Sequence, residues 1–396
     1  MEASLLSFAV DSLQFAICNL QFSAYRPARP LSQEPQMKPR LSVITALALA
    51  PLVARGQNVT DTRLLSQPAV SATHVAFMYA GDLWSAKLDG TDVTRLTTAD
   101  GDELNPVFSP DGKLVAFTGN YDGNMDVYVV PVGGGSPRRL TYHPGGDLAQ
   151  AFTPDGRQVL FVSGRQATTT RLAQLFTVPV TGGAEEALPI PSATQATFAP
   201  DGQRIAYNPL PRAFDQWKRY RGGRNSEIWL FTSATRAMAK IPQPVTRSND
   251  VDAMWIGNTV YFRSDRDGEF NVYSYDVGSK QVRALTKFND FPVLAASSGG
   301  GKIVYERAGY LYLLDPSTAQ SRKLTIGVTA DLRETRPRFV SGNQYIRSAS
   351  ISPSGARVAF ELRGEIVTVP AEKGDARNLT NSPGANDRSP AWSPDG

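Results

Sequence analysis

Cysteine and histidine are nearly absent from this sequence. Among 396 residues there are one cysteine, Cys18, and two histidines, His74 and His143. A single cysteine cannot form an intramolecular disulfide or a cysteine-based zinc site. Two histidines supply a Ser-His-Asp triad or a histidine-ligated metal poorly, and the nucleophile-elbow, zincin, P-loop and dinucleotide-binding motifs are missing. We therefore predict no catalytic residue, no metal site and no cofactor in this chain.

The sequence also lacks a large excess of either positive or negative charge. The formal net charge is +4 at pH 7, from 41 basic and 37 acidic residues. Binding of nucleic acid would need basic residues gathered on one face. The composition gives no such indication, and we predict no nucleic-acid partner.

Long apolar runs are missing except near the N-terminus. Residues 37–56 place Lys38 and Arg40 before an apolar run, 41–49, that is followed by small residues. This run is too short to span about 30 Å of hydrocarbon, and its order is that of a secretory signal. We predict a signal peptide at 37–56 and a periplasmic or secreted protein that meets a membrane only during export. Residues 1–36 are an upstream extension of doubtful status, either a misassigned start or a long leader.

Glycine and proline, by contrast, are plentiful, with 33 and 28 copies. They fall at regular intervals, as in residues 105–141, where NPVFSPDG, KLVAFTGN and MDVYVVPV are followed by SPRRLT. Val115 and Phe117 alternate with polar or small neighbours, which is the period of a β-strand. SPDG, YDGN and VGGG have the composition of tight turns. The segment therefore predicts four short antiparallel strands.

This four-strand unit recurs along the chain. Six copies close on Leu-Thr or a related pair, near Leu96, Leu140, Leu188, Val245, Leu285 and Leu324. Repeats of roughly 40–50 residues indicate a β-propeller, because packing the sheets around an axis buries apolar faces that one sheet leaves open. The rhythm breaks at residues 326–345, resumes at 348–380, and a further copy opens before Gly396. We predict an all-β fold, a six-bladed β-propeller at 57–330 followed at 331–396 by the truncated start of a second propeller.

These segments resemble the tricorn proteases. The order of SPDG, a basic residue, an apolar strand and a D-G turn is that of the Tol-type propeller repeat, and AGDLW at 80–84, WKRYRGG at 217–223 and VPAEKGDARNLT at 369–380 look like tricorn segments. The resemblance covers residues 60–396. It implies a six-bladed propeller, then a seven-bladed one, a PDZ domain and a serine-peptidase core. Residues 331–396 would then begin the seven-bladed propeller, and the catalytic serine would match no residue here.

One insertion supplies the candidate binding site. Residues 209–225 lengthen the fourth copy, and insertions map to loops on one face of a repeat protein. Four cations and two aromatic side chains could hold the carboxylate of a peptide through charge-assisted hydrogen bonds. Alternatively, this is a packing loop whose arginines pair with acidic neighbours on the next domain. The candidate peptide-binding residues are Trp217, Lys218, Arg219, Tyr220, Arg221 and Arg224.

The predicted function is that of the propeller portion of a tricorn-like serine peptidase, guiding peptides to and from a catalytic core that this fragment lacks. The expected partners are peptides, the protein's own PDZ and peptidase domains, and further copies in a homo-oligomer. A non-catalytic periplasmic Tol-type scaffold for protein–protein interaction is the main alternative, and a propeller attached to an α/β-hydrolase peptidase is another. The family archetype is cytosolic, so the cytoplasm is the alternative to export.

Overall fold

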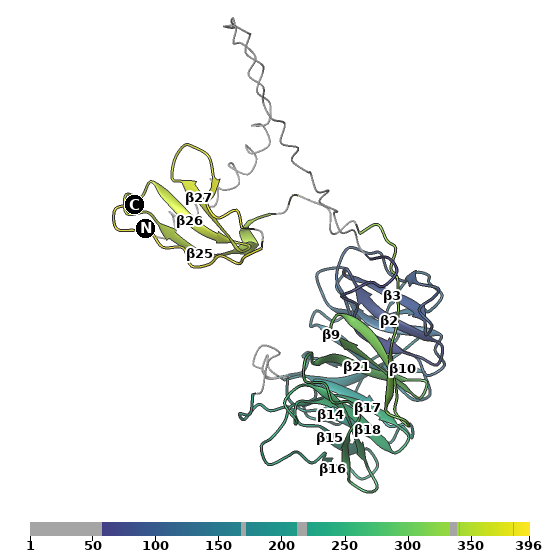
Figure 1. Cartoon of the computed structure of the whole chain (residues 1–396). Helices are drawn as coiled ribbons and strands as arrows, with labels where there is room; N and C mark the ends of the chain where they lie inside the picture. The colour runs from purple at the N-terminus through teal and green to yellow at the C-terminus, as the bar shows by residue number, and fades with distance from the viewer. Residues whose placement is uncertain (1–57, 168–171, 212–219, 333–338, 340, 383) are drawn as a thin grey trace, which may run out of the picture. The chain divides into compact units, whose positions relative to one another are not determined.

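A computed structural model of the chain describes residues 58–167, 172–211, 220–332, 339, 341–382 and 384–396. Its contacts divide the chain into a larger unit, residues 52–335, and a smaller one that combines 336–396 with 1–51 (Figure 1). Each unit is described by itself. The predicted signal peptide at 37–56 lies outside the described residues. Within them, no helix has the length and apolar character to cross a membrane.

The described residues of the larger unit form six sheets, each of four antiparallel strands in sequence order, which we call blades 1 to 6. Blade 1 comprises β1 (Ser66–Val70), β2 (His74–Tyr79), β3 (Asp82–Lys87) and β4 (Thr94–Arg95). Blade 2 comprises β5 (Glu103–Phe108), β6 (Leu114–Gly119), β7 (Asp126–Pro131) and β8 (Arg138–Arg139). Blade 3 comprises β9 (Asp147–Phe152), β10 (Gln158–Ser163), β11 (Gln174–Pro179) and β12 (Glu186–Ala187).

The remaining three blades repeat this order. Blade 4 comprises β13 (Gln195–Phe198), β14 (Arg204–Asn208), β15 (Trp229–Thr232) and β16 (Ala237–Lys240). Blade 5 comprises β17 (Asp250–Ile256), β18 (Thr259–Ser264), β19 (Asn271–Asp276) and β20 (Val282–Ala284). Blade 6 comprises β21 (Val293–Gly299), β22 (Lys302–Arg307), β23 (Tyr310–Asp315) and β24 (Gln320–Lys323).

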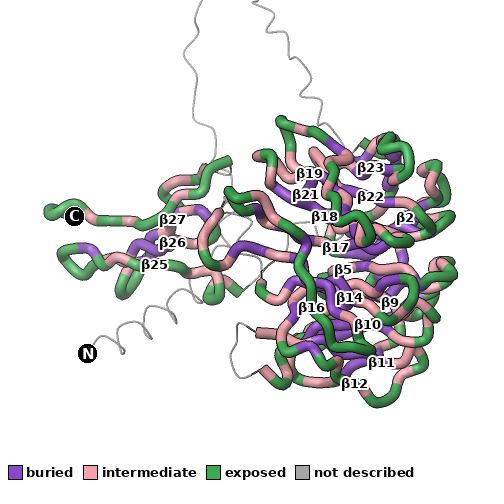
Figure 2. The backbone as a smooth tube through the Cα atoms, turned by 90° about the horizontal axis from the view of Figure 1, so that it is seen from below, coloured by how far each residue is buried: buried purple, intermediate pink, exposed green. Residues whose placement is uncertain are grey.

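The blades follow one another in a ring. The inner strands β1, β5, β9, β13, β17 and β21 contact each other in this order, and β21 contacts β1. Six buried apolar clusters lie between the neighbouring pairs, the last of them between blades 6 and 1. In β2, Val75 and Phe77 pack toward blade 6, whereas Ala76 and Met78 pack toward blade 2. Figure 2 shows burial along these strands. The predicted all-β propeller is confirmed, and its six sheets match the six predicted copies.

The Leu-Thr pair that ends several copies has a structural reason. In blade 1, the Leu96 N–H donates to the Leu83 carbonyl (2.8 Å), and the Leu83 N–H donates to the Thr97 hydroxyl (2.9 Å). The pair therefore fixes the outermost strand to the beginning of the third. The same two bonds recur in blades 2 and 5, at Leu140, Thr141 and Val127 and at Leu285, Thr286 and Val272. The predicted close of the fourth copy near Val245 was wrong, because Val245 is exposed and the equivalent N–H is that of Ile241, which donates to the Ile228 carbonyl (3.0 Å).

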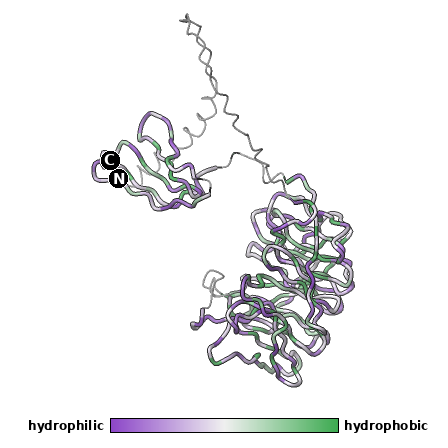
Figure 3. The backbone as a smooth tube through the Cα atoms, viewed as in Figure 1, coloured by the Kyte–Doolittle hydropathy of each residue, from purple (hydrophilic) through white to green (hydrophobic). Residues whose placement is uncertain are grey.

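The SPDG segments are turns between the first and second strands. Ser109 donates its hydroxyl hydrogen to Asp111 (2.6 Å) and accepts a bond from the Leu114 N–H (2.9 Å). Gly112 follows with a φ of 70°, in the left-handed region that favours glycine. These serines are turn residues. The hydrophilic turns alternate with apolar strands along the larger unit (Figure 3).

The smaller unit has one four-stranded sheet among its described residues. A 3₁₀ turn, η2 (Asn343–Tyr345), precedes β25 (Ile346–Ile351), β26 (Arg357–Leu362), β27 (Glu365–Pro370) and β28 (Arg377–Asn378). Phe360 and Val369 form its buried core. The Trp392 indole N–H donates to the Ser350 carbonyl (2.8 Å). The predicted domain boundary at 330, and the assignment of 331–396 to a seven-bladed propeller, stay predictions.

Candidate functional site

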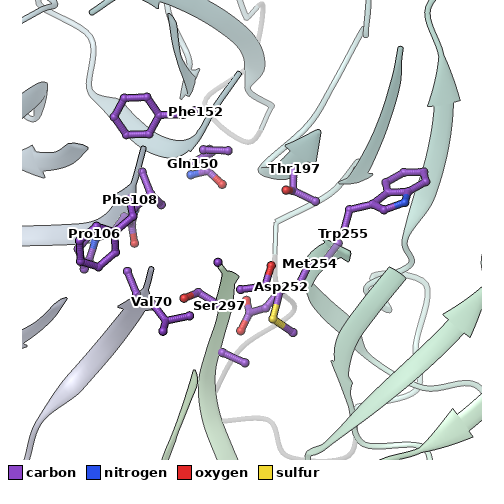
Figure 4. Close-up of a pocket in the computed structure, with 18 of the residues that line it drawn as sticks. Val70, Pro106, Phe108, Gln150, Phe152, Thr197, Asp252, Met254, Trp255 and Ser297 are labelled. Atoms are coloured by element: carbon purple, nitrogen blue, oxygen red, sulfur yellow. The ribbon is translucent and has the colours of Figure 1, made fainter. Parts of the chain in front are cut away.

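A cavity of about 980 Å³ lies between the inner strands of the six blades. Its wall takes residues from β1, β5, β9, β13, β17 and β21, so it is the central channel of the ring. Figure 4 shows Gln150, Thr197, Asp252 and Ser297 around the open space, each from a different blade. The ring geometry therefore creates the site, because no single repeat could enclose it.

Several inner strands carry a β-bulge where they pass this channel. The strand-pairing register shifts next to Gln67 in β1, Asn105 in β5, Gln150 in β9 and Asp252 in β17. Gln67, Asn105 and Asp252 have positive φ angles of 47°, 52° and 54°, which non-glycine residues seldom adopt. A bulge takes one residue out of the ladder and re-aims its side chain. All four polar residues line the channel.

Together with Gln195, these four residues form what we call the polar belt. Hydrogen bonds between neighbouring blades connect most of its members. The Asn105 N–H donates to the Gln67 side-chain oxygen (2.8 Å), and the Gln67 N–H donates to Glu306 (3.1 Å). Gln195 donates its amide hydrogen to Asp252 (2.9 Å) and accepts a bond from the Asp252 N–H (3.3 Å). The bulged backbone of one blade is thus bonded to a side chain of the next.

Two carboxyl groups are the ionisable side chains among the described residues of the channel wall, Asp252 and Glu306. Asp252 forms an ion pair with Arg263, which is buried and also donates to the Val293 carbonyl (2.7 Å). Burial raises the pKa of Glu306, and the Gln67 N–H and the Arg263 charge oppose that rise. Because Arg263 offsets one carboxylate, the wall carries little net charge.

The chemistry of this wall favours binding over catalysis. Its described residues include serines and two threonines but no histidine, lysine or cysteine. A serine nucleophile needs an adjacent base, and neither a histidine nor a lysine of the described wall is there to supply one. Glutamine and asparagine side chains can both donate and accept hydrogen bonds. The channel can therefore pair with the alternating N–H and C=O groups of an extended peptide.

The predicted loop site is described only in part. Trp217, Lys218 and Arg219 are outside the described residues. Arg221 donates to the carboxylate of Asp265 (2.7 Å) and to its backbone carbonyl (3.2 Å).

Three of the six candidate residues are described, and none of them belongs to the channel wall: Tyr220, Arg221 and Arg224. Asn249 donates its side-chain amide to the Tyr220 carbonyl (3.0 Å) and to Asp265 (3.0 Å). The Arg224 N–H donates to the Tyr220 hydroxyl (3.4 Å). Arg221 thus has an acidic partner, which belongs to blade 5 of the same ring and not to the next domain.

Sequence reasoning missed the polar belt. Gln67, Asn105 and Gln195 each stand three residues before the last paired residue of the inner strand, and Asp252 stands four before it, in segments that are otherwise mostly apolar. A polar residue recurring at one position of the repeat was the available signal. Phe108, Phe152 and Phe198, which precede the turns, pack instead into the apolar clusters between blades.

Comparisons with known proteins agree with this architecture. Residues 62–320 match the family model described as the tricorn protease N-terminal beta propeller domain. The chain is 30% identical over 317 residues to tricorn protease homolog 1 of Streptomyces coelicolor, covering 80% of this chain and 30% of that protein. It is 28% identical over 310 residues to the tricorn protease homolog of Saccharolobus solfataricus, covering 76% and 28%.

A solved structure gives the same fold. The crystal structure of the tricorn protease aligns with a TM-score of 0.64 and 24% identity, over 81% of this chain and 31% of that chain. The chain thus spans 28–31% of the length of these three proteins.

Proposed function

The chain belongs to the tricorn protease family, in its N-terminal β-propeller portion, and from this premise we propose that the channel guides peptides to and from a serine-peptidase core of the intact protein. One observation carries the proposal: a channel of about 980 Å³ is lined by amide and apolar side chains from all six blades. A conducting channel must bind its cargo well enough to admit it and weakly enough to release it. A wall of little net charge with paired amides suits an extended peptide in transit.

We also propose that the undescribed part of the 209–225 loop contacts the carboxylate end of such peptides. Arg221 is engaged with Asp265, so the role falls to Trp217, Lys218 and Arg219. Tyr220, Arg221 and Arg224 would hold the loop in place against blade 5. This division of roles combines the two alternatives that the sequence left open.

Narrowing the channel should weaken peptide binding. We expect a Gln150→Trp/Thr197→Trp variant of the chain to bind fluorescein-labelled short peptides at least about tenfold more weakly, since each tenfold loss corresponds to about 1.4 kcal/mol. Fluorescence anisotropy measures the affinity, and thermal melting checks the fold. Met238→Trp is the matched control, because Met238 is exposed on the outer strand β16. Equal binding by all three proteins would rule the channel out.

The same assay tests the loop. Lys218→Ala/Arg219→Ala should weaken binding of peptides with a free C-terminal carboxylate by roughly tenfold or more, because hydrogen bonds to charged groups contribute about 1.5–3 kcal/mol. Peptides with an amidated C-terminus should bind the variant and the parent protein alike. An equal loss for both peptides would contradict a carboxylate contact.

Export is a separate proposal, motivated by the basic residues and apolar run within 37–56. Residues 37–60 fused to a reporter that is active only outside the cytoplasm should give activity. Deleting residues 41–49 should abolish it, because the apolar run is the part of a signal that inserts. A cytosolic, uncleaved fusion would favour the cytoplasm instead.

A further inference from the structure

Three inner strands begin with an acidic residue at the same place in the blade. They are Glu103 in β5, Asp147 in β9 and Asp250 in β17. All three are buried, at 2%, 0% and 0% exposure. A buried carboxylate is costly unless it is paired and hydrogen-bonded. The residue that faces each acid therefore decides its protonation state.

The facing residue always stands two positions beyond the end of the second strand. In blade 3 it is Arg165, whose Nη2 lies 2.5 Å from Asp147 Oδ2. In blade 5 it is Arg266, whose Nη2 lies 3.1 Å from Asp250 Oδ2. In blade 2 the same position holds Tyr121, whose hydroxyl donates to Glu103 Oε1 (2.7 Å). Blade 2 therefore has a neutral phenol where the other two blades have a cation.

The surroundings of Glu103 do not replace that cation. From blade 1, Asp82 faces Glu103 and repels its charge, while Arg95 and Thr97 favour the charged form. Arg95 is already paired with Asp82 at 2.5 Å. Among the described residues, Glu103 Oε2 is buried without a hydrogen-bond partner. Burial is the main cause that raises the pKa of Glu103 to about 7.

Glu103 lies at the seam between blades 1 and 2. Its N–H donates to the Gly81 carbonyl of blade 1 (3.2 Å), and the next two residues, Leu104 and Asn105, line the channel. We propose that Glu103 makes this seam a pH-sensitive junction, closed while the carboxyl keeps its proton and loosened when the proton is lost. At the equivalent seams of blades 3 and 5 an arginine faces the carboxylate, and we expect this cation to weaken the response there.

The sign follows from the direction of the shift. An acid whose pKa is higher in the closed seam than in the open, solvated state ionises first in the open state. The closed seam therefore loses stability as pH rises from about 4.5, the ordinary value, to about 7, and the loss levels off above that. The opening equilibrium should rise by up to about tenfold per pH unit in this window.

Native-state amide hydrogen exchange of the chain between pH 5 and 8, corrected for intrinsic exchange, tests the junction. We expect protection of the Glu103 and Asn120 amides to fall by on the order of a hundredfold over this range. The Asp147 amide of blade 3 is an internal control, and its protection should not change in this way with pH. Glu103→Gln should abolish the fall, because an amide has no proton to lose in this range.

Tyr121→Arg should abolish the fall as well, because it recreates the arginine pair of blades 3 and 5. A wild-type seam whose protection is independent of pH would overturn the proposal, and so would a Glu103→Gln protein that keeps the full dependence. If Tyr121→Arg does not fold, Glu103→Gln alone decides between the two results.

Discussion

Replacing Gly299 with alanine is expected to destabilise the six-bladed ring by about 3 kcal/mol or more, because the new methyl group would overlap backbone atoms of blade 1. A Cβ at Gly299 would lie 1.9 Å from the Val70 carbonyl oxygen. Gly299 ends β21 of blade 6 and Val70 ends β1 of blade 1. The crowded atoms are backbone atoms, not the end of a flexible side chain. The two strands must therefore separate or shift.

A shift at the seam between blades 6 and 1 should destabilise the ring most. This seam joins the first and last blades without a direct chain connection, and the segment before β1 closes it. The Thr62 N–H donates to the Ile326 carbonyl (2.8 Å), and the Val328 N–H donates to the Thr62 hydroxyl (2.9 Å). Gly327 shows the same crowding, since its Cβ would lie 2.0 Å from the Val59 carbonyl oxygen.

Urea denaturation of the variant, the parent and a control glycine variant measures the effect. Gly133→Ala is the control, because Gly133 lies in the turn after β7 and has no atom within 4 Å of the added Cβ. We expect its free energy of unfolding to stay within about 0.5 kcal/mol of the parent, as for most surface substitutions. A Gly299→Ala protein as stable as this control would show that the seam is looser than the geometry indicates.

The repeat could be predicted from the sequence because its marks are local. The Ser109–Asp111 turn bond spans two residues, and the bonds between Leu96, Thr97 and Leu83 span 13 or 14. Such turns and closing pairs recur from copy to copy, so the repeat can be recognised in the sequence. The alternation of Val115 and Phe117 with polar or small neighbours is local as well, and it predicted the strand β6.

The contacts that form the channel and the seams could not be predicted from such local sequence patterns. The bond from Gln67 to Glu306 spans 239 residues, and it exists because the ring returns to its first blade. Arg221 and Asp265 are 44 residues apart, and nothing local marks them as partners. Such pairs depend on how the blades pack around the ring. The repeat predicts a propeller fold, but it does not predict which residues of neighbouring blades meet.

Removing the guanidinium of Arg165 is expected to cost about 3–5 kcal/mol, since breaking a buried ion pair leaves an uncompensated charge. Asp147 is fully buried, and Arg165 reaches it at 2.5 Å while also approaching Glu185 at 3.2 Å. The Arg165 guanidinium also lies 5.2 Å and 5.1 Å from the ring centroids of Phe161 and Phe176. An alanine at 165 would thus lose packing as well as charge.

Three further variants separate these causes in urea denaturation. Arg157→Ala removes an exposed pair with Asp155 and should cost less than about 1 kcal/mol. Arg165→Met keeps most of the packing but should remain strongly destabilised, because Asp147 stays buried without its partner. Adding Asp147→Asn should recover much of that loss, since replacing both members of a buried pair is far milder than removing one. If Arg165→Met alone proves as stable as the parent, the pair contributes packing and no charge compensation, and blade 2 would then differ from blade 3 only in shape.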